Sequence, residues 1–251
     1  MAYGFYNLLD KLKRYYTFSK FEKRWLLLSI VILAFIVGFN DGREVFEWGP
    51  WLQNFILGLI AVIIAVFVHQ SVQRIFGLEQ GYRVEFKPFI YGLIGGLVIA
   101  FMSYGKLIVL AYSGLKLNIM EKHRLGYFRY QLGYFQLGKI SAMGPIANLM
   151  VAILFSVMTF LPAAFIEKMV LVNVLFAITN MLPIPPMDGA NVLYASRIIY
   201  VLLLAGIAAV GLMLIYSWVS TLYAVITGIA FGFLAFTLYI MKVESKGGWK
   251  K

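Results

Sequence analysis

The chain has 251 residues, of which 62% are hydrophobic and 13% are charged, and its mean hydropathy is +0.84. This composition excludes a soluble globular domain and indicates a polytopic membrane protein that forms one membrane domain over residues 1–251. The net charge of +11 comes from bases that lie between apolar runs, which indicates topology determinants and excludes a nucleic-acid-binding surface. The chain contains no cysteine, which excludes disulfides and cysteine-ligated metal sites.

The first half of the chain predicts two spans and a strand. Residues 1–24 are aromatic and basic, and we expect them to form an interfacial segment at the surface of the lipid bilayer. A first span is expected at Trp25–Phe39, and an acidic loop follows at Asp41–Glu47. A longer helix is expected at Trp51–Phe76, and the alternating polarity of Gly81–Lys87 predicts a short strand.

The segment Phe89–Tyr104 is apolar but only about 16 residues long, whereas a spanning helix needs roughly 20. It contains the glycine-rich run "GLIGGL". The flanking regions Arg74–Lys87 and Lys106–Lys139 are both basic, and basic loops remain in the cytoplasm. We therefore expect Phe89–Tyr104 to be re-entrant and bent at its glycines.

The rest of the chain predicts one hairpin and more helices. Lys106–Leu117 has β-branched and aromatic residues around Ser113-Gly114, which predicts a β-hairpin. Further spans are expected at Ile140–Leu161, Phe165–Leu182, Ile198–Tyr216 and Leu222–Ile240, the last two within the C-terminal helices of residues 194–251. The expected fold is an all-α polytopic membrane protein with about six transmembrane helices, a re-entrant segment and a short β-hairpin. Both termini are expected in the cytoplasm.

The stretch "VFVHQSVQRIFG", residues 66–77, places polar side chains at the end of an apolar helix. His69 and Gln73 are four residues apart and share a helix face. Polar side chains here can also reflect interfacial polarity, with Arg74 extending its guanidinium to the membrane surface.

Two later stretches carry matching polar groups. "GKISAMGPIANL" places Asn148 in an apolar helix, where an amide can also serve only to join helices. "TNMLPIPPMDGANVL" breaks a helix at its prolines and then presents Asp188, and a carboxylate in this position needs a cation or a donor. With Phe89–Tyr104 re-entrant, His69 and Asp188 are expected at one depth near the cytoplasmic side.

These residues resemble the signatures of the site-2 proteases, which are intramembrane zinc metalloproteases. The family's H-E-x-x-H motif corresponds in register to His69-Gln70-Ser71-Val72-Gln73. Its N-x-x-P-x-P-x-x-D-G element is matched by Asn180 to Gly189, and "GPIANL" also resembles the family. The resemblance covers a protease-like core over residues 51–193.

The resemblance implies a role for each matched residue. His69 and Asp188 would be zinc ligands, and Asn148 would lie near the reacting carbonyl. The substrate would be a transmembrane helix of another membrane protein, cleaved in regulated intramembrane proteolysis. The substrate-binding residues would be Asn180, Pro183 and Pro185.

The chain departs from the family at both key positions of the first motif. Gln70 replaces the glutamate that acts as general base, and an amide cannot take a proton from water. Gln73 replaces the second histidine ligand, so only two of the three zinc ligands remain and Zn²⁺ binding should be weak or absent. The only other histidine, His123, lies in a basic loop at no matching position. The chain as given is therefore predicted to be catalytically inactive.

Three interpretations remain open from the sequence. The chain is either a deliberately inactivated protease or a natural pseudoprotease that binds membrane helices without cleaving them. Outside the family, His69 and Asp188 would suit a small ion- or proton-coupled membrane transporter.

Overall fold

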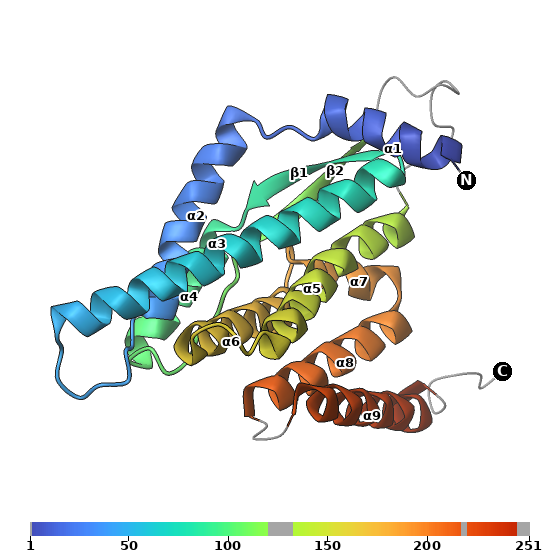
Figure 1. Ribbon diagram of the computed structural model, residues 1–251. Coiled ribbons are helices and arrows are strands. Elements are labelled where there is room, and N and C mark those ends of the chain that lie inside the picture. Colours follow the sequence, from blue (N-terminus) through green and yellow to red (C-terminus); the bar gives the residue numbers. More distant parts are fainter. Residues whose placement is uncertain (1, 120–132, 217–219, 245–251) are drawn as a thin grey trace.

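The computed structural model describes residues 2–119, 133–216 and 220–244, and Figure 1 shows a bundle of helices with one small sheet. The strands are β1 (Tyr82–Pro88) and β2 (Ser113–Ile119). The helices are α1 (Ala2–Tyr15), α2 (Lys20–Gly38), α3 (Trp48–Glu79), α4 (Ile90–Met102), α5 (Tyr134–Val157), α6 (Ala163–Asn180), α7 (Asp188–Ala195), α8 (Arg197–Tyr216) and α9 (Thr221–Tyr239), followed by the π-helix η1 (Ile240–Glu244).

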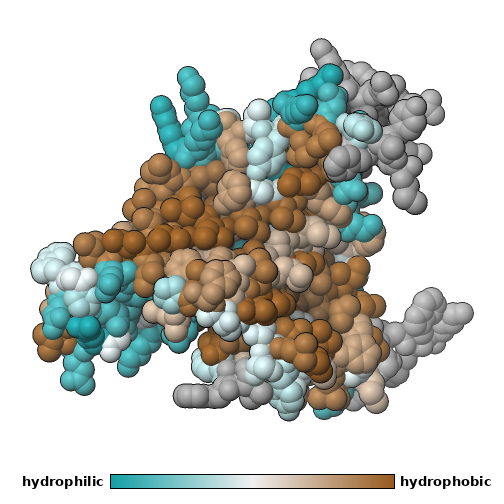
Figure 2. Space-filling model, in the orientation of Figure 1, coloured by the Kyte–Doolittle hydropathy of each residue, from teal (hydrophilic) through white to brown (hydrophobic). Residues whose placement is uncertain are grey.

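Five helices of the described residues are long and apolar enough to cross a membrane, namely α3, α5, α6, α8 and α9. This finding confirms an all-α polytopic membrane protein. Six spans were expected, and the one that is not among these five is the first, which lies in α2. Its first turns carry Lys20, Glu22, Lys23 and Arg24, so the apolar part that starts at Trp25 is short. Figure 2 shows a hydrophobic surface along α3 between two hydrophilic ends of the molecule.

The N-terminal 24 residues form α1 and the start of α2, with a break between them. Ser19 ends the break because it caps α2. Its Oγ accepts the N–H of Glu22 at 3.1 Å, and the Glu22 carboxylate accepts the N–H of Ser19 at 2.8 Å. Lys11 of α1 donates from Nζ to the carbonyl of Leu78 at 3.0 Å, which attaches α1 to the last turn of α3.

The sheet differs from the expected hairpin. The strand predicted at Gly81–Lys87 is confirmed as β1, but its antiparallel partner is β2, with Pro88 opposite Ser113 and Tyr82 opposite Ile119. The prediction of a hairpin within Lys106–Leu117 is wrong, because Ser113 and Gly114 begin a strand and do not form a turn. Ser113 and Gly114 lie opposite Pro88 and Lys87, which are at least 25 positions earlier in the chain. Local sequence cannot reveal such a pairing.

The segment between the two strands leaves the sheet and returns to the same end of it. α4 runs outward from β1, and a chain without helix or strand over residues 106–112 leads back to β2 (Figure 1). The expected bend at the glycines is wrong, because α4 continues through them without a break. The chain turns instead at Tyr104 and Gly105, whose φ angles are 51° and 72°. A Cβ at Gly96 would lie 2.7 Å from the carbonyl oxygen of Val109, so this glycine lets the returning chain pack on α4.

The tip of this loop lies beside the end of α2. Asn40 donates from Nδ2 to the carbonyl of Tyr104 at 2.9 Å. Lys106 consequently lies with the acidic loop that follows α2, and not on the side of Lys87 as expected from its charge. The side of the membrane that each end faces stays a prediction.

We expect single cysteines to report this arrangement, because the chain has none of its own. Cysteine in place of Glu44 or Lys106 should react with a membrane-impermeant maleimide added outside cells. Cysteine in place of Lys116, which is exposed on β2, should react only after permeabilisation. Labelling of Lys106→Cys and Lys116→Cys from the same side, or of Glu44→Cys and Lys106→Cys from opposite sides, would contradict the fold, whereas labelling of Lys116→Cys alone from outside would reverse the expected orientation.

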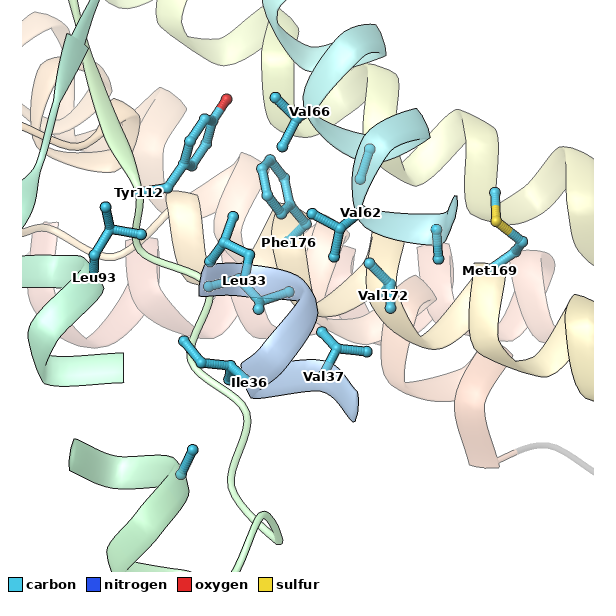
Figure 3. Close-up of a cluster of buried hydrophobic side chains, with 14 of the residues drawn as sticks. Leu33, Ile36, Val37, Val62, Val66, Leu93, Tyr112, Met169, Val172 and Phe176 are labelled. Atoms are coloured by element: carbon cyan, nitrogen blue, oxygen red, sulfur yellow. The ribbon is translucent and has the colours of Figure 1, made fainter. Parts of the chain in front are cut away.

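The main apolar core lies between α2, α3, α4 and α6, as Figure 3 shows. The His69 ring touches the edge of this core, with its centroid 5.4 Å from that of Phe176 and 6.0 Å from that of Tyr112. α8 and α9 pack against each other on the far side from α2 in Figure 1. Gly228 and Gly232 allow this close approach, because a Cβ on either would meet the α8 backbone within 3 Å.

Candidate functional site

The polar residues of α3 meet side chains of α5 and α7 inside the bundle. His69 is fully buried. Its Nδ1 lies 2.8 Å from Oδ1 of Asn148 on α5, and its Nε2 lies 2.8 Å from Oδ2 of Asp188 at the start of α7. The structure thus brings together three residues that are widely separated in the sequence and that the sequence analysis grouped.

Gln73 lies on the same wall as His69, one turn further along α3. Its Nε2 donates to the carbonyl of Ser141 at 3.2 Å. A Cβ at Gly144 would lie 2.4 Å from Nε2 of His69 and 2.7 Å from Nε2 of Gln73. Both nitrogen atoms therefore approach one point on α5, and only glycine leaves room for them there.

Gln70 contacts the chain that returns from α4. Its Nε2 donates to the hydroxyl of Tyr112 at 2.9 Å, and both side chains are buried. Tyr112 could not be predicted as a site residue, because no periodicity or motif marks a tyrosine in a loop. Its position follows only from the pairing of β1 with β2.

Asp188 is placed by the break between α6 and α7. α6 ends at Asn180, and a loop with exposed Pro183 and Pro185 leads to α7. Gly189 allows α7 to start close to the end of α6, since a Cβ there would lie 2.1 Å from the carbonyl oxygen of Met181. Asn180 itself is buried and donates to the carbonyl of Phe176 in its own helix at 2.8 Å. Its side chain thus stays inside the bundle, whereas the two prolines lie at the surface.

Asn148 is held in one orientation by two acceptors. Its Nδ2 donates to the carbonyl of Ala65 at 3.0 Å and to Oδ1 of Asn173 at 3.1 Å. Its Oδ1 therefore faces His69 and accepts from Nδ1, which leaves Nε2 directed at Asp188. Asn173 was also missed, although an amide within the apolar run "VLVNVLF" is a signal that could have identified it.

Arg74 does not extend to the membrane surface, contrary to the simpler interpretation of its stretch. It is 2% exposed and forms a buried ion pair with Glu22 of α2. Its Nη1 donates to the carbonyl of Thr17 at 3.2 Å, and its guanidinium lies 4.0 Å from the ring centroid of Phe18. Glu22 also accepts the N–H of Phe86 in β1 at 2.8 Å. The pair thus joins α3, β1 and the N-terminal segment behind the site.

The residues present do not fit a catalytic zinc ion. Such a site uses three protein ligands from His, Cys, Asp or Glu. His69 and Asp188 supply two, and the third position near Gly144 carries the amide of Gln73. Within the described ranges, no group of three such residues could hold a metal ion. His123 lies outside those ranges. Gln70 adds no group that could accept a proton from water.

Comparison with known proteins gives one informative similarity. The chain is 27% identical over 205 residues to a protein of Methanocaldococcus jannaschii that is named "Putative zinc metalloprotease". The aligned region covers 79% of this chain and 96% of that protein. No protein-family model matches the chain, and no solved structure matches it. The chain is therefore a polytopic membrane protein similar to a protein described as a zinc metalloprotease.

Proposed function

We propose that this chain has the architecture of a site-2 protease and binds transmembrane helices of other membrane proteins without hydrolysing them. The cluster of His69, Asp188 and Asn148 carries the proposal. Three polar side chains from three helices meet inside the bundle at the positions where the resemblance puts zinc ligands and a carbonyl-binding amide. The similarity to a protein described as a zinc metalloprotease supports the same assignment.

The loss of hydrolysis follows from the chemistry of two amides. Peptide hydrolysis at zinc needs a metal-polarised water and a group that takes its proton. Gln73 takes the position of a ligand and Gln70 the position of the base, and neither amide can perform that task. Both side chains are instead engaged in hydrogen bonds with Ser141 and Tyr112.

Helix binding would use the surface beside the cluster, because the cluster itself is closed. His69, Gln73 and Asp188 are at most 3% exposed. The loop between α6 and α7 exposes Pro183, Ile184 and Pro185, and Pro186 of that loop packs directly on Gly114 of β2. A partly unwound helix could lie along this loop and β2 and offer backbone groups for pairing.

A photo-crosslinking residue in place of Ile184 tests the proposal in reconstituted vesicles. The matched control is Ile226 of α9, since both isoleucines are exposed, at 48% and 58%. A synthetic transmembrane peptide with a central Asn-Pro pair should crosslink at position 184 and not at 226, and mass spectrometry should find it intact. An unbroken leucine–alanine helix should crosslink weakly at both. Equal crosslinking at both positions, or a cleaved peptide, would refute the proposal.

A further inference from the structure

A cavity of about 700 Å³ lies at the end of α2, far from His69. Its walls come from the loop between α2 and α3, the first turn of α3, and the tip of the loop that follows α4. A cavity of this size is within the range of sites for small ligands, about 300–1,000 Å³. In Figure 2 this end of the molecule is a hydrophilic patch that borders the hydrophobic surface of α3.

Hydrogen bonds hold the walls of the cavity in place. Asn40 joins the end of α2 to the loop tip through the carbonyl of Tyr104. Asn54 of α3 donates from Nδ2 to the carbonyl of Gly38 at 3.1 Å and to that of Asn40 at 3.0 Å. The cavity is thus built between three elements that are tied together, and it does not depend on a single loose loop.

Charges of both signs line the cavity without an ion pair to a described residue: the carboxylates of Asp41 and of exposed Glu44, and the ammonium of Lys106. Oδ1 of Asp41 accepts the N–H of Arg43 at 3.2 Å, but its Oδ2 is buried and has no hydrogen-bond partner among the described residues. Lys106 lines the same cavity, and no described acidic side chain lies within ion-pair distance of its ammonium. Arg43 is different, since it pairs with Glu47 at 3.0 Å. A ligand with both a positive and a negative group would complement Asp41 and Lys106.

Aromatic rings form the side of the cavity that continues into the membrane-facing surface. The ring centroids of Phe46 and Trp48 are 5.0 Å apart, and those of Trp48 and Trp51 are 6.1 Å apart. Such rings attract ammonium groups through their faces and gather where a protein meets the lipid headgroups. From Trp48 an exposed apolar row continues along α3 at every fourth residue, through Leu52, Ile56 and Ile60.

We propose that this cavity binds the headgroup of a phospholipid that carries both a phosphate and an amine. The phosphate would lie at Lys106, and the ammonium would lie at Asp41 against the tryptophan rings. An acyl chain would follow the apolar row of α3. This row is the reason to assign a lipid rather than a water-soluble molecule with the same charges.

Tryptophan quenching by dibrominated lipids tests the site in the full-length protein in detergent. Three lipids with identical brominated chains are compared: phosphatidylethanolamine, phosphatidylglycerol without an amine, and a dialkylammonium lipid without a phosphate. Phosphatidylethanolamine should quench the tryptophan fluorescence at the lowest mole fraction of the three lipids. The double variant Trp48→Phe, Trp51→Phe measures the quenching of the other tryptophans, which is the background.

Asp41→Asn and Lys106→Gln should each raise the half-quenching mole fraction of phosphatidylethanolamine about tenfold, as expected for one lost charge-assisted hydrogen bond. Asp10→Asn and Lys116→Gln remove the same charges elsewhere and should leave it unchanged. Equal quenching by all three lipids, or equal effects of site and control variants, would show that the cavity contacts lipids without specificity and would overturn the proposal. Displacement of the bound lipid by equimolar soluble glycerophosphoethanolamine would also overturn it, in favour of a water-soluble ligand.

Discussion

Gln70→Glu and Gln73→His introduced together should turn the chain into a zinc-dependent protease of membrane helices. An imidazole at position 73 would enter the space beside Gly144 that His69 also faces, and would complete a set of three ligands with Asp188. A carboxylate at position 70 would supply the base. Cleavage of a transmembrane peptide in detergent, followed by mass spectrometry and by measurement of bound zinc, checks the result.

The single changes should separate metal binding from proton transfer. Gln73→His alone should raise zinc affinity by more than the roughly 10- to 100-fold that outer-shell partners of a metal site contribute, because it adds a ligand. Without the base it should hydrolyse about 100- to 10,000-fold more slowly than the double variant. Gln70→Glu alone should do little, because both groups act on one water molecule. Gln80→His, at the residue that caps the end of α3 and outside the cluster, is the control for an added histidine.

Two results would contradict this account. Robust cleavage by the unaltered chain would show that hydrolysis does not need Glu and His at these positions. A folded double variant that binds no zinc would show that His69 and Asp188 do not form half of a zinc site. Asp188→Ala in the double variant should abolish zinc binding and cleavage together.

Glu22→Gln should strongly destabilise the fold, although Glu22 lies outside the helix bundle's polar cluster. Its carboxylate pairs with buried Arg74 and accepts the N–H of Phe86. The substitution leaves the Arg74 charge buried and unpaired, which costs about 3–5 kcal/mol. For a chain of this size such a loss corresponds to a fall in the apparent Tm of roughly 6–20 °C. Thermal unfolding in detergent, followed by circular dichroism, measures it.

The effect of pH should have a defined sign. Burial opposes ionisation of Glu22, but the N–H groups of Phe86 and Ser19 and the Arg74 guanidinium outweigh it and lower the pKa of Glu22 below its ordinary 4.5. A carboxylate with a lowered pKa stabilises the folded state fully above pH 4.5, and this contribution is lost as the pH falls through the folded-state pKa. The difference in Tm between the parent and Glu22→Gln should therefore shrink in acid.

Asp10→Asn provides the matched control for this experiment. Asp10 pairs with Arg14 at 2.9 Å, but both side chains are more than half exposed. Loss of an exposed pair costs at most about 1 kcal/mol. A Glu22 variant as stable as the Asp10 variant would show that the Arg74 ion pair does not support the fold.

The spans and the polar groups of the site could be predicted from the sequence because their signals are local. A run of apolar residues gives a helix wherever it lies, which predicted α3, α6, α8 and α9 to within three residues at each end and α5 to within six. The "PIPPMDG" stretch predicted the break before Asp188 for a similar reason, since proline cannot continue a helix. Intramembrane polarity marked His69 and Asn148, and their combination with Asp188 and the resemblance to the site-2 proteases predicted a site.

Signals of charge and turn chemistry were less dependable. Ser113-Gly114 has the composition of a turn, yet it begins β2, because pairing with β1 satisfies its backbone groups better than a local turn. Lys106 was assigned by charge to the side of Lys87, yet the chain reverses only at Gly105, beyond α4, and places Lys106 beside Asn40. The pairing of Ser113-Gly114 and the place of Lys106 both depend on residues far away in the chain, so the residues next to them do not predict either.

By itself the sequence determined that the chain is a membrane protein, where its apolar helices lie, and which residues in them are polar. Only the tertiary structure decided which of those polar residues are partners. It joined Arg74 to Glu22, Gln70 to Tyr112 and Asn148 to Asn173. The physical reason is that a polar group buried in an apolar bundle must find a hydrogen-bond partner, while its partner's place in the chain is fixed by how the helices pack.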